Sequence, residues 1–156
     1  MAMRRLTDNR VVQQLGWAAA ACWLVSWFLP VVEGYPGWAA FRAALAGPFR
    51  ETFPVRGDDA VPQLLSALTN VAFVVLLVYW RRGRVSNWTL YLKIALACLL
   101  IDLYWLVQML RAGEYRALLA GYYAWLLAFA LLVALGAVNV ASNRRTSKTP
   151  TGGMQA

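Results

Sequence analysis

The sequence predicts an all-α membrane protein, a four-transmembrane-helix bundle whose helices run up and down in turn. Of 156 residues, 61% are hydrophobic and only 14% are charged, whereas soluble domains are about 45–50% apolar and about 25% charged. The apolar residues fall in four runs of roughly 18–24 residues, enough to cross a ~30 Å hydrocarbon layer at about 1.5 Å per residue. Basic residues flank these runs, as insertion into a membrane favours.

The chain begins with a polar, basic segment, residues 1–14, which we expect to be a cytoplasmic tail. The first span is predicted over residues 15–32, where the transmembrane domain of residues 15–141 begins. This run contains several tryptophans and Pro30, and no small-x-small cleavage site follows it. We therefore interpret it as a retained span rather than a signal peptide.

The longest connection is an outer loop over residues 33–62, and its first part has helical character. A short helix is predicted over residues 36–47. Apolar side chains recur there at spacings of three and four, with Arg42 off their face: Trp38, Phe41 and Leu45. A short amphipathic helix of this kind is typical of the membrane interface.

Three further apolar runs complete the domain, and they predict spans over residues 63–80, 88–110 and 118–141. Short polar turns separate these runs, so consecutive spans should be antiparallel neighbours. The last segment, residues 142–156, is polar and rich in glycine and threonine, and we expect it to be a disordered cytoplasmic tail.

The distribution of lysine and arginine predicts the orientation. Ten of the 15 lie in the two termini, in the loop between the second and third spans, and at Lys93 beside that loop, against five in the other two loops. The side richer in basic residues should be cytoplasmic, so both termini should lie inside. The pattern "SWFLPVV…PGW" resembles short proteins of bacterial inner membranes, which implies the cell inner (plasma) membrane.

Composition also argues against several classes of function. Histidine is absent, so haem or zinc held by histidine and histidine general-base chemistry are excluded. The two cysteines, Cys22 and Cys98, lie apart in predicted spans, where cysteine usually acts as a small hydrophobe. No catalytic or phosphate-binding motif is present. We expect no cofactor, no metal and no nucleic-acid partner; the net charge of +8 suits an anionic membrane surface.

One carboxyl group is placed unusually, because Asp102 lies inside the third span. A charged residue at a helix centre costs about 2.5–3.5 kcal/mol on insertion scales, so its side chain should face protein or water. Asp102 should lie about 12 Å from the outer end of its span, and polar or aromatic residues of the other spans reach a similar depth. We therefore expect one polar cluster, centred on Asp102 and Asn70. Its other candidate members are Ser26, Ser66, Thr69, Tyr122 and Tyr123.

Two interpretations of this cluster are open. In the structural one, Asn70 and a tyrosine hydroxyl hold Asp102 and fix the register of the helices. In the functional one, Asp102 lines an outward-facing pocket and binds a proton, a cation or a polar ligand. Three residues outside the cluster could form an outer lid over it, or simply rest among the headgroups: Glu33, Trp38 and Arg42.

Three classes of function are compatible with these features. The first is a non-catalytic accessory, scaffold or assembly subunit, whose partners are the lipid bilayer and other membrane subunits or a second copy. Small residues that could serve such contacts recur on the first and fourth spans. The second is an oligomeric small transporter or channel that uses Asp102. The third is an enzyme acting on lipid or quinone, for which the chain offers few catalytic residues, because it has no histidine and no paired cysteines.

Overall fold

The computed structural model describes residues 2–32, 35–46 and 60–147, and within these ranges the chain is almost entirely helical. The four long helices are α1 (Ala2–Phe28), α3 (Ala60–Arg81), α4 (Trp88–Ala112) and α5 (Ala120–Ser147). The shorter elements are strands β1 (Pro30–Val32) and β2 (Tyr35–Pro36), helix α2 (Gly37–Ala46) and the 3₁₀ turn η3 (Tyr115–Ala117).

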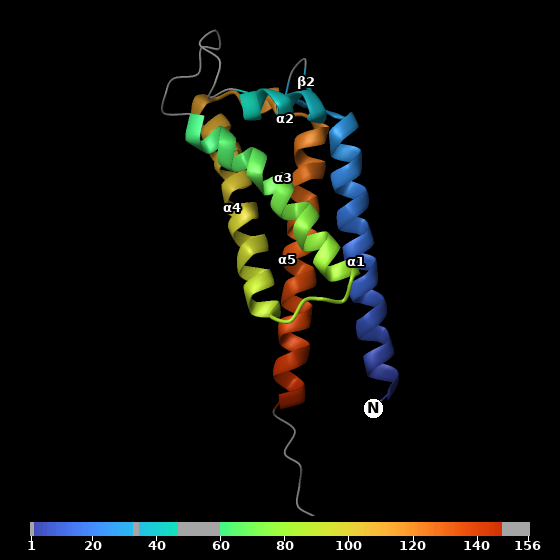
Figure 1. The fold of residues 1–156 in the computed structure, drawn as a ribbon. Helices are drawn as coiled ribbons and strands as arrows, with labels where there is room; N and C mark the ends of the chain where they lie inside the picture. The colour runs from blue at the N-terminus through green and yellow to red at the C-terminus, as the bar shows by residue number, and fades with distance from the viewer. Residues whose placement is uncertain (1, 33–34, 47–59, 148–156) are drawn as a thin grey trace, which may run out of the picture.

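The predicted fold class is confirmed. In the part of the chain that the structure describes, four helices are long and apolar enough to cross a membrane, so the chain is a small multi-span membrane protein. Their apolar segments are Arg10–Phe28, Val61–Arg81, Trp88–Ala112 and Ala120–Arg144. Successive long helices run in opposite directions, and the beginning of α1 and the end of α5 lie at the same end of the bundle (Figure 1). The helix α2 lies across the other end.

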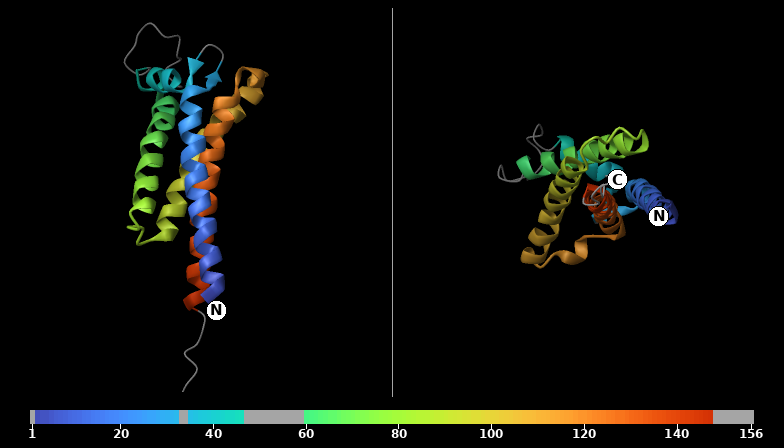
Figure 2. Two further views of the ribbon diagram at one scale, coloured as in Figure 1. Left: turned by 90° about the vertical axis from the view of Figure 1, so that its right-hand side faces the viewer. Right: turned by 90° about the horizontal axis from the view of Figure 1, so that it is seen from below.

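The arrangement is not a square of four equivalent helices, because α5 is central. It packs along the length of α1 on one side and against α4 on the other, whereas α1 and α3 touch at few points. Two views show α1 and α5 side by side, with α3 crossing the bundle obliquely (Figures 1 and 2). Helix α5 is therefore the main partner of α1 and α4, whereas α3 packs chiefly against α4 and α2.

The first span is shorter at its outer end than predicted. Helix α1 ends at Phe28, and Pro30–Val32 form β1 in place of a last helical turn. Proline lacks a backbone N–H and restricts the residue before it, so Pro30 ends the helix instead of kinking it. The strand pairs with β2. The carbonyl oxygen of Val31 also accepts a hydrogen bond from the N–H of Leu119 at 2.9 Å, which ties this corner to the start of α5.

The predicted tails also differ from the structure. Helix α1 already begins at Ala2, so most of the segment 1–14 continues the first span as helix. Helix α5 extends to Ser147, so residues 142–147 are helical and not disordered. The remainder of the predicted C-terminal tail, residues 148–156, lies outside the described residues. In both places the polar residues extend an apolar helix by further turns, which costs less than starting a new helix.

The core lies in the half of the bundle nearer the termini, which we call the terminal half. Phe73 of α3 packs edge-on against Phe129 of α5, with ring centroids 5.2 Å apart, and stacks on Trp23 of α1 at 5.3 Å. Small residues bring the backbones close here: Ala19, Ala95 and Ala128 are fully buried. At Gly16, any side chain would collide with the ring of Trp80, so only glycine lets that ring lie against α1.

Candidate functional site

The carboxyl group of Asp102 is enclosed between two helices. Asp102 is completely buried, and its Oδ1 accepts hydrogen bonds from two hydroxyl groups of α3. The donors are Ser66 Oγ at 3.3 Å and Thr69 Oγ1 at 3.1 Å, and the Thr69 hydroxyl shares its one hydrogen with the backbone oxygen of Ser66 at 2.6 Å. The other oxygen, Oδ2, has no hydrogen-bond partner among the described residues. The carboxyl group therefore ties α4 to α3 through only one of its two oxygens.

Local sequence explains this contact. Ser66 and Thr69 are three residues apart on α3, so their side chains lie on one face of the helix. On α4 the buried face carries Tyr91, Ala95, Cys98 and Asp102, as the helical spacing predicts. Ala95 and Cys98 are small, which lets the neighbouring backbones approach closely.

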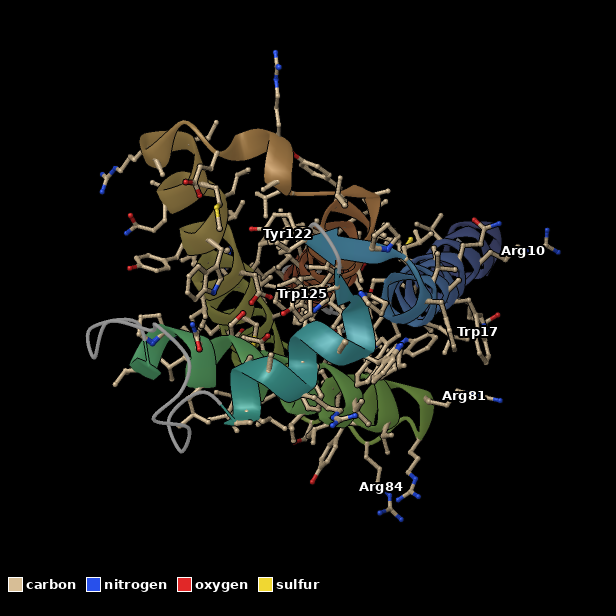
Figure 3. All side chains as sticks on the ribbon, turned by 90° about the horizontal axis from the view of Figure 1, so that it is seen from above. Arg10, Trp17, Arg81, Arg84, Tyr122 and Trp125 are labelled. Carbon is tan, nitrogen blue, oxygen red and sulfur yellow. The ribbon has the colours of Figure 1, made fainter. Side chains whose placement is uncertain are left out.

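Two further residues connect the other helices to this level. Tyr122 of α5 donates its hydroxyl hydrogen to the backbone oxygen of Asp102 at 2.6 Å. Asn70 Oδ1 accepts indole N–H groups from Trp23 of α1 at 3.0 Å and from Trp125 of α5 at 3.2 Å. Tyr122 and Trp125 both lie between the helices when the bundle is seen from the α2 end (Figure 3).

We call Ser66, Thr69, Asn70, Asp102 and Tyr122 the polar cluster. The structure brings all five together, as the sequence predicts. Their bonding differs from the expected pattern in one respect, because two hydroxyl groups hold the carboxyl group of Asp102, whereas Asn70 binds two indoles. Depth within the spans predicts which residues meet, but it does not determine which donor takes which acceptor.

The other two candidate members lie apart from Asp102. Ser26 is buried near the end of α1, where its hydroxyl donates to the carbonyl oxygen of Trp23 at 2.6 Å. Tyr123 is 47% exposed, and its ring meets the edge of the Tyr122 ring at 5.8 Å. Adjacent residues on a helix point about 100° apart, so only one of the two tyrosines can face the cluster.

Beside the polar cluster lies a cavity of about 340 Å³, a size common for small-molecule sites. Helix α2 covers it, and side chains from β1 and all four long helices contribute to its walls. Its polar lining comes from Ser26, Tyr35, Gln63, Ser66, Asn70 and Tyr122, and its aromatic lining includes Trp27, Phe41, Trp105 and Trp125. Every lining residue that the structure describes is uncharged. Asp102 is not among them, and Ser66 lies on the boundary between the acid and the cavity.

Helix α2 turns mostly small residues toward the cavity, while Trp38 and Leu45 of its predicted apolar face stay partly exposed. The residues that it turns toward the cavity are small, apart from one ring: Gly37, Ala40, Phe41, Ala43 and Ala44. The Phe41 ring contacts Trp27 of α1, with centroids 5.2 Å apart. A side chain at position 37 would collide with the backbone of Ser26, so glycine is needed where α2 turns back over α1.

Two of the predicted lid residues, Trp38 and Arg42, do not line this cavity. Trp38 is 45% exposed, and the guanidinium group of Arg42 lies 5.7 Å from the centre of its ring. Glu33 lies outside the described residues. The cover is thus formed by the small face of α2.

The sequence interpretation missed the aromatic part of the site. Trp23 and Trp27 are four residues apart on α1, a spacing that puts both rings on one face of the helix. That spacing could have indicated that one face of the first span meets polar partners, because a buried indole N–H usually finds an acceptor. Gln63, Trp27 and Trp105 have no side-chain hydrogen bond within the described residues, so their N–H groups are free to meet a ligand.

Within the described ranges, no three histidine, cysteine, aspartate or glutamate side chains gather as a metal site would need. Both cysteines are free thiols. Comparisons of the chain with models of protein families, with curated proteins and with solved structures found no significant match.

Proposed function

We propose that the protein is a non-catalytic accessory, scaffold or assembly subunit of the cell inner membrane. The observation that supports this role is the seclusion of Asp102. An acid that transfers protons to a substrate, or carries an ion, must be reached by its partner. Asp102 is instead completely buried, and it holds two helices together.

The surface of the bundle supports the same proposal. Several apolar side chains of α3 stay 38–54% exposed, and they follow one another along the side of the helix: Val71, Val74, Val75 and Val78. In a membrane such a face contacts lipid or another span. Packing between spans depends on shape and not on a hydrophobic difference from lipid, so these branched residues are suited to either neighbour.

The orientation is part of the proposal, with both termini in the cytoplasm. Basic side chains that remain exposed at the terminal end come from α1, α3 and the loop that follows α3. Arg10, Arg81 and Arg84 all project outward there (Figure 3). This end also contains the end of α5, with Arg144. Basic residues are favoured on the cytoplasmic side.

Co-purification from native membranes tests the role. A tagged chain is expressed at its native level, extracted in mild detergent and analysed by mass spectrometry. We expect a membrane-protein partner in fixed ratio, and we expect Asp102→Asn to retain it, because an amide oxygen can still accept the two hydroxyl bonds. Recovery of the chain alone, from both a mild detergent and a cross-linked sample, would contradict the proposal.

One observation favours a second candidate, an oligomeric transporter or channel. Asp102 Oδ2 has no partner among the described residues, and Ser66 contacts both the acid and the cavity. Movement of Ser66 would open a route to the carboxyl group. This candidate predicts proton or cation flux in reconstituted vesicles that Asp102→Asn abolishes. Vesicles that show no flux with the unaltered chain would exclude it.

A further inference from the structure

We propose that the cavity under α2 binds the hydroxyl group of a neutral, lipid-soluble alcohol or phenol. The two sources of such a group in a membrane are a quinol ring and the free hydroxyl of a neutral lipid. This inference does not depend on the accessory role, since it concerns what the cavity holds and not which protein the chain joins.

The first argument concerns charge. All described lining residues are uncharged, and four aromatic rings, Trp27, Phe41, Trp105 and Trp125, form much of the wall. A charged headgroup would lose its hydration here without gaining an ionic partner, at a cost of several kcal/mol. The ligand should therefore be neutral and largely apolar.

The second argument concerns hydrogen-bond direction. Four side chains with a hydroxyl group line the cavity, Tyr35 among them, and the three buried ones already donate their only hydrogen within the protein. Ser26 donates to Trp23 O at 2.6 Å, Ser66 to Asp102 Oδ1 at 3.3 Å, and Tyr122 to Asp102 O at 2.6 Å. Each oxygen is left with lone pairs only, so these three groups can accept from a ligand but cannot donate to it.

The side-chain amide groups of Asn70 and Gln63 supply hydrogen-bond donors to the cavity. Asn70 Oδ1 is occupied by two indole N–H groups, and Asn70 Nδ2 makes one long contact of 3.5 Å to Ser66 O. The side-chain amide of Gln63 has no partner among the described residues, and it lines the same cavity. Acceptors and donors thus occur together. A hydroxyl group donates one hydrogen bond and accepts others, whereas an ether or ketone oxygen only accepts.

The third argument concerns depth. Ser26 is two residues from the end of α1, and Gln63 and Tyr122 lie within the first turn of α3 and α5. These three groups therefore lie close to the helix ends, where the hydroxyl group of an amphiphile rests while its tail stays in hydrocarbon, and Ser66 and Asn70 continue the polar lining deeper along α3. The ligand would keep the depth that it has in the bilayer.

Binding is tested with matched pairs of compounds on the full chain in nanodiscs. The pairs are dodecylhydroquinone with its dimethyl ether, and dioctanoylglycerol with its O-methyl ether. Tryptophan emission reports binding, because Trp27, Trp105 and Trp125 line the cavity. We expect saturable binding of the hydroxyl member of at least one pair, about tenfold tighter than its ether, the size of a 1.4 kcal/mol difference. The pair that shows this preference identifies the source.

Two neighbouring residues of α2 provide the variant and its control. Ala44→Phe places a ring in the cavity and should abolish saturable binding, whereas Leu45→Phe adds a ring on the 37% exposed side and should leave it unchanged. A separate variant, Ser26→Ala, should reduce the preference for hydroxyl over ether at least fivefold without filling the space.

Three results would overturn the proposal. They are equal affinity for hydroxyl and ether compounds in both pairs, no saturable signal with any of them, and an identical loss in Ala44→Phe and Leu45→Phe. Should Ala44→Phe fail to give a monodisperse protein, the comparison of Ser26→Ala with the unaltered chain still decides the question.

Discussion

The polar cluster near α2 and the core of the terminal half hold the same helices together by different means. Near α2, α3 is joined to α4 and α5 by hydroxyl, carboxyl and amide groups, and a cavity of about 340 Å³ remains beside them. In the core of the terminal half, rings and small residues fill the space, and Phe73, Phe129 and Leu132 are wholly buried, while a second hollow of about 330 Å³ lies at its rim beside Trp17 and Trp80. Hydrogen bonds need defined directions, whereas dispersion needs only contact. The half of the bundle near α2, which is held by hydrogen bonds of defined direction, can therefore keep its shape around the cavity.

The largest effect is expected from breaking the packed half. Phe129→Ala removes a fully buried ring that contacts both Phe73 and Trp125. We expect the free energy of unfolding to fall by about 3 kcal/mol, because the bundle cannot close the space that the ring leaves. The measurement is unfolding in mixed micelles titrated with SDS and followed by circular dichroism. Leu127→Ala, at a 51% exposed position of the same helix, is the control and should cost much less.

The second effect comes from the polar half. Asp102→Ala leaves the hydroxyl groups of Ser66 and Thr69 without their carboxyl acceptor. The unfolding free energy should fall by about 2 kcal/mol, somewhat more than a single hydrogen bond between membrane helices contributes. Asp102→Asn, measured in the same titration, should recover at least half of the loss. Equal losses of unfolding free energy in the two variants would show that Asp102 does not join the helices by accepting hydrogen bonds from Ser66 and Thr69.

A smaller effect sharpens the comparison at Asn70. Trp23→Phe keeps the ring that stacks on Phe73 and removes one of the two N–H donors to Asn70 Oδ1. We expect a loss of about 0.6 kcal/mol, the mean for such bonds in membranes. Trp125→Phe removes the other donor. The double variant should lose more than the sum of the single ones, because Asn70 Oδ1 then has no donor; strict additivity in this cycle would count against a shared acceptor.

The smallest effect is expected at the rim of the terminal half. The guanidinium group of Arg81 lies 5.3 Å from the centre of the Trp17 ring, which in turn meets the edge of Trp80 (Figure 3). Arg81→Gln should cost about 0.5 kcal/mol, since this cation–π contact is exposed. Arg84→Gln removes the same charge from the adjoining loop. If both variants lose the same stability, net charge and not the ring contact is responsible.

The sequence predicts the fold of this chain well because the bilayer restricts what long apolar runs can form. It also predicts the level at which the polar residues meet, since 1.5 Å per residue converts position into depth. It predicts less well where Pro30 ends α1 and where α5 ends, because helix ends depend on a few local contacts. It does not predict which face of α2 packs inward. Trp38 is larger than Ala40 or Ala44, yet the two alanines line the cavity and Trp38 stays 45% exposed.

The same reasoning could not locate the cavity. Its walls come from segments far apart in the chain. In the sequence, its tryptophans cannot be told from tryptophans that lie at the membrane–water interface. Trp27 of α1 and Trp105 of α4 could face either lipid or the inside of the bundle. The rotation of each helix about its own axis decides between the two when the helices pack. Hydropathy alone carries no information about that rotation.

The central position of α5 has a consequence for biogenesis. Helix α5 is made after α1, α3 and α4, so during synthesis α1 and α4 enter the lipid before the helix with which they make most of their contacts. The hydrogen bond from Leu119, the residue before α5, to Val31 joins positions 88 residues apart, so it too forms late in synthesis. Chains truncated before α5 should therefore leave α1 without its main partner, although α3 and α4 stay joined through Asp102, and should be degraded faster by membrane proteases.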